Sequence, residues 1–101
     1  MTHKTRIIIK DDLADLSTAG THIFAMTARD SVTEKGRFAV AVSGGSTPRL
    51  MHRMLSGTPY GSEIPWDKTH IFWVDERCVP ENNPASNYGS AKKDFLDPAP
   101  A

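Results

Sequence analysis

FAVAVSGGSTP, residues 38–48, joins an apolar run to a glycine-rich turn. The first five residues are apolar without interruption, which is typical of a strand buried on both faces of a parallel sheet. Ser43–Ser46 predicts a tight turn. Thr47 and Pro48 predict the N-cap and the first residue of a helix, where the missing N–H of proline is not needed. A strand that turns directly into a helix is the repeating unit of α/β folds.

The segment before this unit continues the alternation. Arg6–Ile9 is a short β-branched run and predicts a strand. The carboxylate of Asp11 or Asp12 can cap a helix, which we expect from about Asp12 to Lys35, because apolar residues recur at helical spacing between them. Gly36 is a natural stop for that helix.

The segment after the turn completes the pattern. Leu and Met residues at helical spacing within residues 50–55 predict a second helix, which the glycines and proline of residues 57–61 end in a loop. Ile71–Val74 is another fully apolar run and predicts a third strand. Tyr88–Phe95 predicts a short helix. The order strand, helix, strand, helix, strand predicts a parallel sheet in one α/β domain, residues 1–101.

Composition argues against several classes of protein. Twelve Lys and Arg balance twelve Asp and Glu, so the zero net charge gives no reason to expect a nucleic acid or a membrane surface as partner. Cys78 is the only cysteine, which rules out an internal disulfide and suits a reducing cytoplasm. Metal-ligand spacing is absent, and no apolar stretch approaches the roughly 20 residues that span a bilayer. We therefore expect a cytoplasmic protein without a bound metal.

The glycine-rich turn is a candidate anion site. Gly44 and Gly45 let the backbone approach a ligand closely, and Ser46, Thr47 and the free amides of the helix N-terminus offer donors. A phosphate is the simplest ligand for such a turn. A capped turn that binds nothing is an equally good interpretation of this motif alone.

The second candidate motif follows the third predicted strand. Asp75, Glu76 and Arg77 come directly after it, at the sheet edge where open α/β sheets bind ligands. Arg77 could hold a phosphate or carboxylate through a two-pronged contact, and Asp75 could orient a ligand hydroxyl or a catalytic group. A solvated ion pair is the alternative, but two polar motifs at the same edge favour a site.

A third motif, residues 82–89, is rich in Asn and could close Asn87 and Tyr88 over a ligand; it could equally be only a turn-rich loop. The histidines are weaker candidates. His22, His52 and His70 are isolated from one another, and we expect them to be structural or solvated, with His52 on the surface.

The three motifs, in this order and spacing, resemble the glucosamine-6-phosphate isomerase/6-phosphogluconolactonase family, and the Trp-Val-Asp-Glu-Arg form of the second motif favours its lactonases. The resemblance covers about residues 38–95. It implies a Rossmann-like three-layer parallel sheet, of the kind found in sugar-phosphate isomerases and CoA transferases, here truncated after βαβαβ. The chain would then be the N-terminal portion of a longer lactonase domain.

The resemblance also implies an activity. The reaction is hydrolysis of 6-phosphogluconolactone to 6-phosphogluconate in the oxidative pentose phosphate pathway, without a metal or an organic cofactor. Asp75 and Arg77 are the implied catalytic residues: Asp75 would order the site, and Arg77 would contact the anionic substrate. The implied substrate-binding residues, besides Arg77, are Ser43, Gly44, Gly45, Ser46, Thr47 and Asn87.

One element of the family pattern is absent. In the family, a His in a Gly-His stretch after a later strand is thought to activate the water, and these 101 residues contain no such stretch. We therefore assign no general base. A sugar-phosphate isomerase or deaminase of the same fold, and a noncatalytic sugar-phosphate-binding fragment, stay open as alternatives. A half-sheet would also leave apolar surface uncovered, so we expect a second chain or a further C-terminal segment to complete it.

Overall fold

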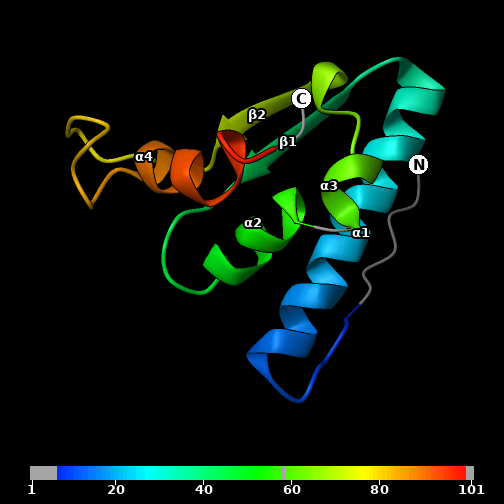
Figure 1. Cartoon of the computed structure of the whole chain (residues 1–101), viewed down its shortest axis with the longest axis horizontal. Coiled ribbons are helices and arrows are strands. Elements are labelled where there is room, and N and C mark those ends of the chain that lie inside the picture. Colours follow the sequence, from blue (N-terminus) through cyan, green and yellow to red (C-terminus); the bar gives the residue numbers. More distant parts are fainter. Residues whose placement is uncertain (1–6, 58, 100–101) are drawn as a thin grey trace.

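The fold alternates helices with two parallel strands. A computed structural model of the chain describes residues 7–57 and 59–99. These residues form α1 (Leu13–Lys35), β1 (Phe38–Val42), α2 (Arg49–Ser56), α3 (Tyr60–Glu63), the 3-10 helix η1 (Trp66–Lys68), β2 (Thr69–Trp73), α4 (Asn87–Ala91) and the π-helix η2 (Lys92–Leu96). In Figure 1 the two strands lie side by side, and α2 lies between α1 and η2, packed against both.

The long helix α1 confirms the expected helix and both of its ends. The Asp12 carboxylate accepts a hydrogen bond from the Asp15 N–H at 2.8 Å, which caps the first turn. At the other end Gly36 has a φ of 78°, and its N–H donates to the Val32 carbonyl. This left-handed conformation is the ordinary way for glycine to end a helix.

The two strands expected after α1 are also confirmed, although β2 starts two residues before the expected Ile71 and ends at Trp73 rather than at Val74. β1 and β2 pair in parallel, from Phe38 opposite Thr69 to Val42 opposite Trp73. The connection between them runs through α2, α3 and η1, as parallel pairing requires a long crossover. The chain is therefore an α/β protein with a parallel sheet.

The strands are buried on one face only, which corrects the expectation of burial on both. Phe38 and Val42 are 5% exposed and face the helices, whereas Ala39 and Ala41 between them are exposed. On the neighbouring strand Phe72 is 59% exposed. Because all the described helices that touch the core cover the same face, the described residues form two of the three expected layers.

The expected first strand is wrong over its described residues. Ile7–Lys10 has no regular secondary structure, and Ile7 and Ile9 are 81% and 86% exposed. A strand needs a neighbour for its N–H and C=O groups, and no described residue pairs with this run. Arg6 lies outside the described residues. The described order is thus helix, strand, helix, strand rather than βαβαβ.

Two further boundaries differ from the expectation. α2 begins at Arg49, and Pro48 occupies the N-cap position without a side-chain cap, so Thr47 is not the N-cap. The loop after α2 contains one helical turn, α3. The expected helix at residues 88–95 is confirmed as α4 and η2.

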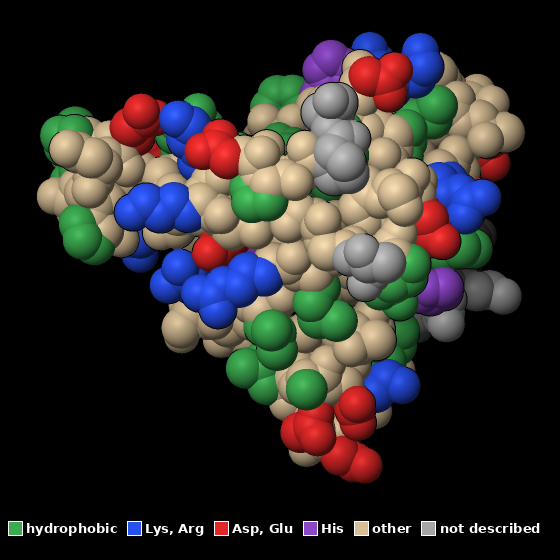
Figure 2. Space-filling view, viewed as in Figure 1, with side chains coloured by type: hydrophobic (Ala, Val, Ile, Leu, Met, Phe, Trp, Pro, Cys, Tyr) green, Lys and Arg blue, Asp and Glu red, His purple; other side chains and the backbone are tan. Residues whose placement is uncertain are grey.

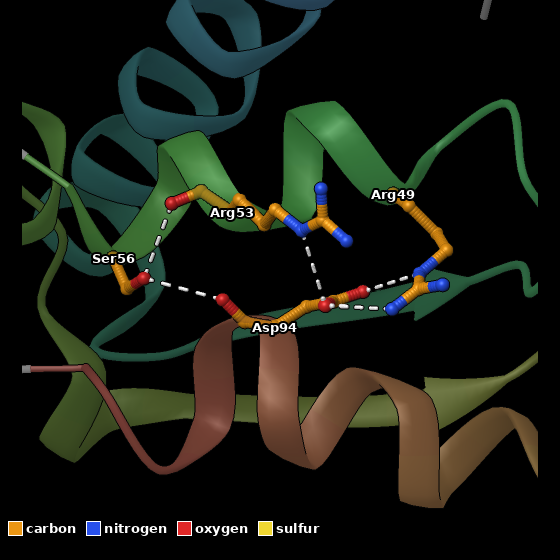
Figure 3. A network of polar contacts seen from close by, with 4 residues as sticks. All are labelled: Arg49, Arg53, Ser56 and Asp94. Atoms are coloured by element: carbon orange, nitrogen blue, oxygen red, sulfur yellow. Dashed lines mark hydrogen bonds and ion pairs between the residues drawn. The ribbon is translucent and has the colours of Figure 1, made fainter.

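A buried carboxylate ties α2 to η2. Asp94 accepts hydrogen bonds from Arg49 Nε at 3.0 Å and Nη2 at 3.2 Å, and from Arg53 Nε at 3.4 Å. Ser56 Oγ lies 3.4 Å from the Asp94 carbonyl, so three residues of α2 converge on one residue of η2 (Figure 3). The Arg49 guanidinium is the main reason that the pKa of Asp94 is lowered.

His52, expected on the surface, is instead buried beneath this network. It is 3% exposed, and its ring centroid lies 5.1 Å from that of Phe95. Burial is the main cause of its lowered pKa, because a charged imidazole is poorly solvated there. Phe95 and Leu55 are 0% exposed and complete this part of the core.

Asp94→Asn should destabilise the chain in a pH-dependent way. At neutral pH we expect the free energy of unfolding to fall by about 1.5–3 kcal/mol, the range for hydrogen bonds to charged groups. Since folding lowers the pKa of Asp94, its contribution is present above the ordinary aspartate pKa and is lost as the pH falls through the folded value. The difference from wild type should therefore shrink in acid.

The measurement is urea denaturation of both chains at several pH values. Asp97→Asn is the matched control, because Asp97 is exposed on the same segment and its side chain forms no ion pair within residues 7–57 and 59–99. Equal destabilisation by the two variants at neutral pH would contradict the assignment.

Candidate functional site

The glycine-rich loop, residues 43–47, leaves the end of β1 and leads to α2. Gly45 has a φ of 98°, which other residues rarely adopt, so the turn requires glycine there. Ser43, Ser46 and Thr47 are exposed on the loop. The Arg49 N–H at the start of α2 makes only a long contact of 3.4 Å with the Ser46 carbonyl. The loop therefore exposes three hydroxyl groups to solvent and is followed by a backbone N–H, that of Arg49, which is only weakly hydrogen-bonded.

The second polar loop starts at the same edge of the sheet. The Val74 N–H donates to the Val42 carbonyl at 3.0 Å, immediately after the last paired residues of the two strands. Asp75, Glu76 and Arg77 follow, all exposed. As the sequence predicts, parallel pairing places this loop beside the glycine-rich loop.

Asn87 connects the two loops from the start of α4. Its Nδ2 donates to the Asp75 carbonyl at 3.1 Å and to Asp75 Oδ1 at 3.2 Å. Its Oδ1 accepts a hydrogen bond from Arg77 Nη1 at 2.9 Å. The same amide group packs against the backbone of Gly44, where any added side chain would overlap it. Asn87 is 4% exposed, so these contacts lie under the surface of the site.

Glu76 is the residue of this site whose role the sequence did not predict. Its Oε1 accepts hydrogen bonds from the N–H groups of Arg77 and Asn87, both at 2.8 Å, and its Oε2 accepts one from the Tyr88 N–H at 2.9 Å. These backbone donors, led by Tyr88 and Asn87, lower the pKa of Glu76. The carboxylate thus stays ionised and holds the first turn of α4 against the second loop.

Arg77 is held at one end and free at the other. Its Nη1 donates to the Ala85 carbonyl at 3.1 Å as well as to Asn87. Within the described part of the chain, Nε and Nη2 form no hydrogen bond. A guanidinium has five N–H donors, so Arg77 retains donors for an anionic ligand.

An aromatic pair lies beside these polar groups. Trp73, the last residue of β2, meets Tyr88 of α4 edge to face, with ring centroids 6.0 Å apart. The contact joins β2, which leads to the loop of Asp75, to the helix that carries Asn87. It therefore fixes the same two segments that the hydrogen bonds join.

The structure thus brings together four of the residues expected at the site, namely Gly44, Asp75, Arg77 and Asn87. Ser43, Gly45, Ser46 and Thr47 lie on the same loop as Gly44, and the hydroxyls of the three polar residues form no hydrogen bond to Asp75, Arg77 or Asn87.

The described histidines lie elsewhere. His22 lies on α1, His52 is buried against Phe95, and His70 lies near the start of β2, at the opposite end from Asp75. Among the described residues no group of His, Cys, Asp and Glu is arranged to hold a metal ion. No described helix is both long enough and apolar enough to cross a bilayer.

Two cavities lie outside the four-residue cluster. A small one of about 170 Å³ lies beside α4 and is lined by Arg49, Lys93 and residues 81–84, among others. A larger one of about 810 Å³ lies between residues 8–10 and α1. None of the expected site residues lines the larger cavity, so its size does not make it the candidate site.

Comparison with known proteins gives a consistent family. The family model for glucosamine-6-phosphate isomerases/6-phosphogluconolactonase matches residues 11–101. A probable 6-phosphogluconolactonase 1 of Oryza sativa subsp. japonica is 38% identical over 86 residues, which are 85% of this chain and 29% of that protein. A 6-phosphogluconolactonase of Haemophilus influenzae is 43% identical over 58 residues, 57% of this chain and 25% of that protein.

Solved structures give the same result for the fold. The 6-phosphogluconolactonase of Trypanosoma brucei matches 98% of this chain with a TM-score of 0.83 and 26% identity. That of Trypanosoma cruzi matches 99% of it with a TM-score of 0.81 and 28% identity. Both matches cover 38% of the solved chain, so this chain spans well under half the length of the proteins it resembles.

The described fold is therefore a part of a Rossmann-like domain, and the match extends over nine-tenths of the sequence. This chain belongs to the glucosamine-6-phosphate isomerase/6-phosphogluconolactonase family.

Proposed function

We propose that this chain forms the substrate-binding part of a 6-phosphogluconolactonase, which hydrolyses 6-phosphogluconolactone to 6-phosphogluconate in the oxidative pentose phosphate pathway. One observation carries the proposal: the glycine-rich loop and the Asp75–Arg77 loop start at one sheet edge, and Asn87 joins them. The names of the relatives and solved structures support a lactonase over the isomerases of the family.

The site offers what an anionic sugar lactone needs for binding. The exposed hydroxyls of Ser46 and Thr47 and the amides of their loop form a phosphate-binding loop in this proposal. Arg77 supplies a fixed positive charge with unused donors, and the Asp75 carboxylate accepts hydrogen bonds from sugar hydroxyls. No metal or organic cofactor is invoked.

Hydrolysis also needs a general base. A water must add to the lactone carbonyl, the ring C–O bond must break, and the ring oxygen must take up a proton. A positioned base typically contributes 10²–10⁴-fold to such a step, and none of His22, His52 and His70 lies at this edge. We propose that the base belongs to a further segment or a second chain. A noncatalytic sugar-phosphate-binding fragment is the second candidate, favoured by the placement of these histidines.

In this proposal the segment or second chain that supplies the base also covers the exposed face of the sheet. Phe72 and Val74 are 59% and 65% exposed on or beside the face that the helices do not cover. Each strand also has one edge without a described neighbour, since β1 and β2 pair only with each other. We propose that a further C-terminal segment or a second chain covers this face and extends the sheet. We also propose a cytoplasmic location, supported by the exposed free thiol of Cys78.

Arg77→Ala should weaken the binding of 6-phosphogluconate by about tenfold or more, because it removes the guanidinium that Asn87 and Ala85 hold beside the two loops. Isothermal titration calorimetry of the 101-residue chain measures this directly. Arg37→Ala is the control, since Arg37 is exposed and lies at the far end of β1 from the site. An unchanged affinity in Arg77→Ala, or no binding by the wild-type chain, would sink the proposed function.

Turnover should separate the two candidate functions. With freshly generated 6-phosphogluconolactone, we expect this chain alone to stay within a few-fold of the spontaneous rate, because the base is missing. Adding a polypeptide that corresponds to the remaining part of a relative should raise the rate. A rate far above background for the chain alone would place a base among the present residues, and no rise on addition would favour the noncatalytic fragment.

The uncovered face should make the isolated chain self-associate. We expect concentration-dependent oligomers in sedimentation velocity, and Phe72→Gln should shift them toward monomer. Ile23→Gln, which changes an apolar residue 45% exposed on α1, is the control and should have little effect. A strictly monomeric wild-type chain with sharply cooperative thermal unfolding would contradict this expectation.

A further inference from the structure

The side-chain amide of Asn87 has no free donor for a ligand. An Asn amide has two N–H donors and one carbonyl acceptor. The Nδ2 group faces the backbone carbonyl and the carboxylate of Asp75, and Oδ1 faces Arg77 Nη1. With the side chain buried as well, Asn87 is poorly placed to touch a substrate, although the family resemblance implies that it binds one.

The two adjacent glycines of the loop meet different demands. At Gly45 the backbone conformation requires glycine, but a side chain there would meet nothing within 4 Å. At Gly44 φ is not positive, and the restriction is steric: a Cβ would overlap Oδ1, Cγ and Nδ2 of Asn87. The absence of a side chain at Gly44 therefore makes room for the Asn87 amide.

Glu76 in turn fixes where this amide sits. One of its oxygens accepts from the N–H of Asn87 and the other from the N–H of Tyr88, so the first residues of α4 cannot shift without breaking both bonds. Ser86 Oγ accepts from the Gly89 N–H at 3.0 Å and holds the same turn from the other side. The backbone of Asn87 is thus held independently of its side-chain contacts.

We propose that Asn87, seated by Glu76, is a positioning residue that sets the spacing between the glycine-rich loop and the Asp75–Arg77 loop. Its amide packs against the backbone of Gly44 and is hydrogen-bonded to Asp75 and Arg77, so it lies in contact with both loops. The inference rests on the proposed function, because the spacing matters only if a sugar phosphate binds across both loops.

A double-mutant cycle tests this positioning role. Gly44→Ala and Asn87→Ala should each weaken 6-phosphogluconate binding by about tenfold, the first by pushing the amide away and the second by removing it. Because alanine at position 87 lacks the overlapping atoms, the double variant should bind no more weakly than Asn87→Ala alone. Independent effects would instead multiply to about a hundredfold.

Gly45→Ala supplies the matched control. Its effect comes from backbone strain rather than from Asn87, so combining it with Asn87→Ala should give multiplied losses. The inference is overturned if Gly44→Ala is as harmful with alanine at position 87 as with asparagine. It is also overturned if the Gly45 pair shows the same non-additivity.

A readout without ligand separates this inference from the proposed function. The NMR signals of the Arg77 guanidinium should show a restricted side chain in the wild type and a mobile one in Asn87→Ala, with a far-UV spectrum that stays unchanged. Glu76→Gln, which exchanges an acceptor oxygen for a donor group, is the second variant and should loosen Arg77 partly. If the wild-type chain binds no 6-phosphogluconate, the function fails. An Arg77 signal unchanged in both variants defeats the positioning role itself.

Discussion

Val42 pairs with Trp73 at the end of the two strands, and this parallel pairing determines where both polar loops begin. In an antiparallel pair the two loops would lie at opposite edges. Here they start side by side, so a residue from a third segment can bond to one and pack on the other. Asn87 does this. The ladder also continues one bond further toward the loops, from the Val74 N–H to the Val42 carbonyl.

The Asp94 network connects the two helices that follow this edge of the sheet in the chain. It bonds the first two turns of α2, which follow the glycine-rich loop, to η2, which follows α4. Figure 2 shows several cationic side chains over this part of the surface, with acidic atoms between them, while other cationic side chains lie elsewhere on the same face. The segment from the glycine-rich loop to α2 is therefore connected twice to the segment from α4 to η2. Asn87 makes one connection at the site, and Asp94 makes the other. Such cross-connections keep a small core from separating into independent pieces.

Much of this arrangement could be predicted from local patterns. The left-handed Gly36 and the two apolar strands are set by neighbouring residues and could be predicted, and the cap of α1 could be predicted to lie at Asp11 or Asp12, of which the structure has Asp12. Apart from the N-cap of α2, which is Pro48 rather than Thr47, and the ends of β2, the errors concern distant contacts. Ile7–Ile9 has strand composition but no described partner, and the buried ring of His52 packs against Phe95, which comes from another helix.

The candidate site likewise has a part that could be predicted from the sequence and a part that could not. Its location follows from motif order and sheet topology, whereas the role of Glu76 depends on backbone donors eleven and twelve residues away. No spacing rule links a loop carboxylate to the start of so distant a helix. The pairing of Trp73 with Tyr88 has another consequence, since indole emission responds to its surroundings. Trp73 lies two residues before Asp75 and touches the residue after Asn87, so the chain carries a fluorophore of its own beside the junction of the two loops.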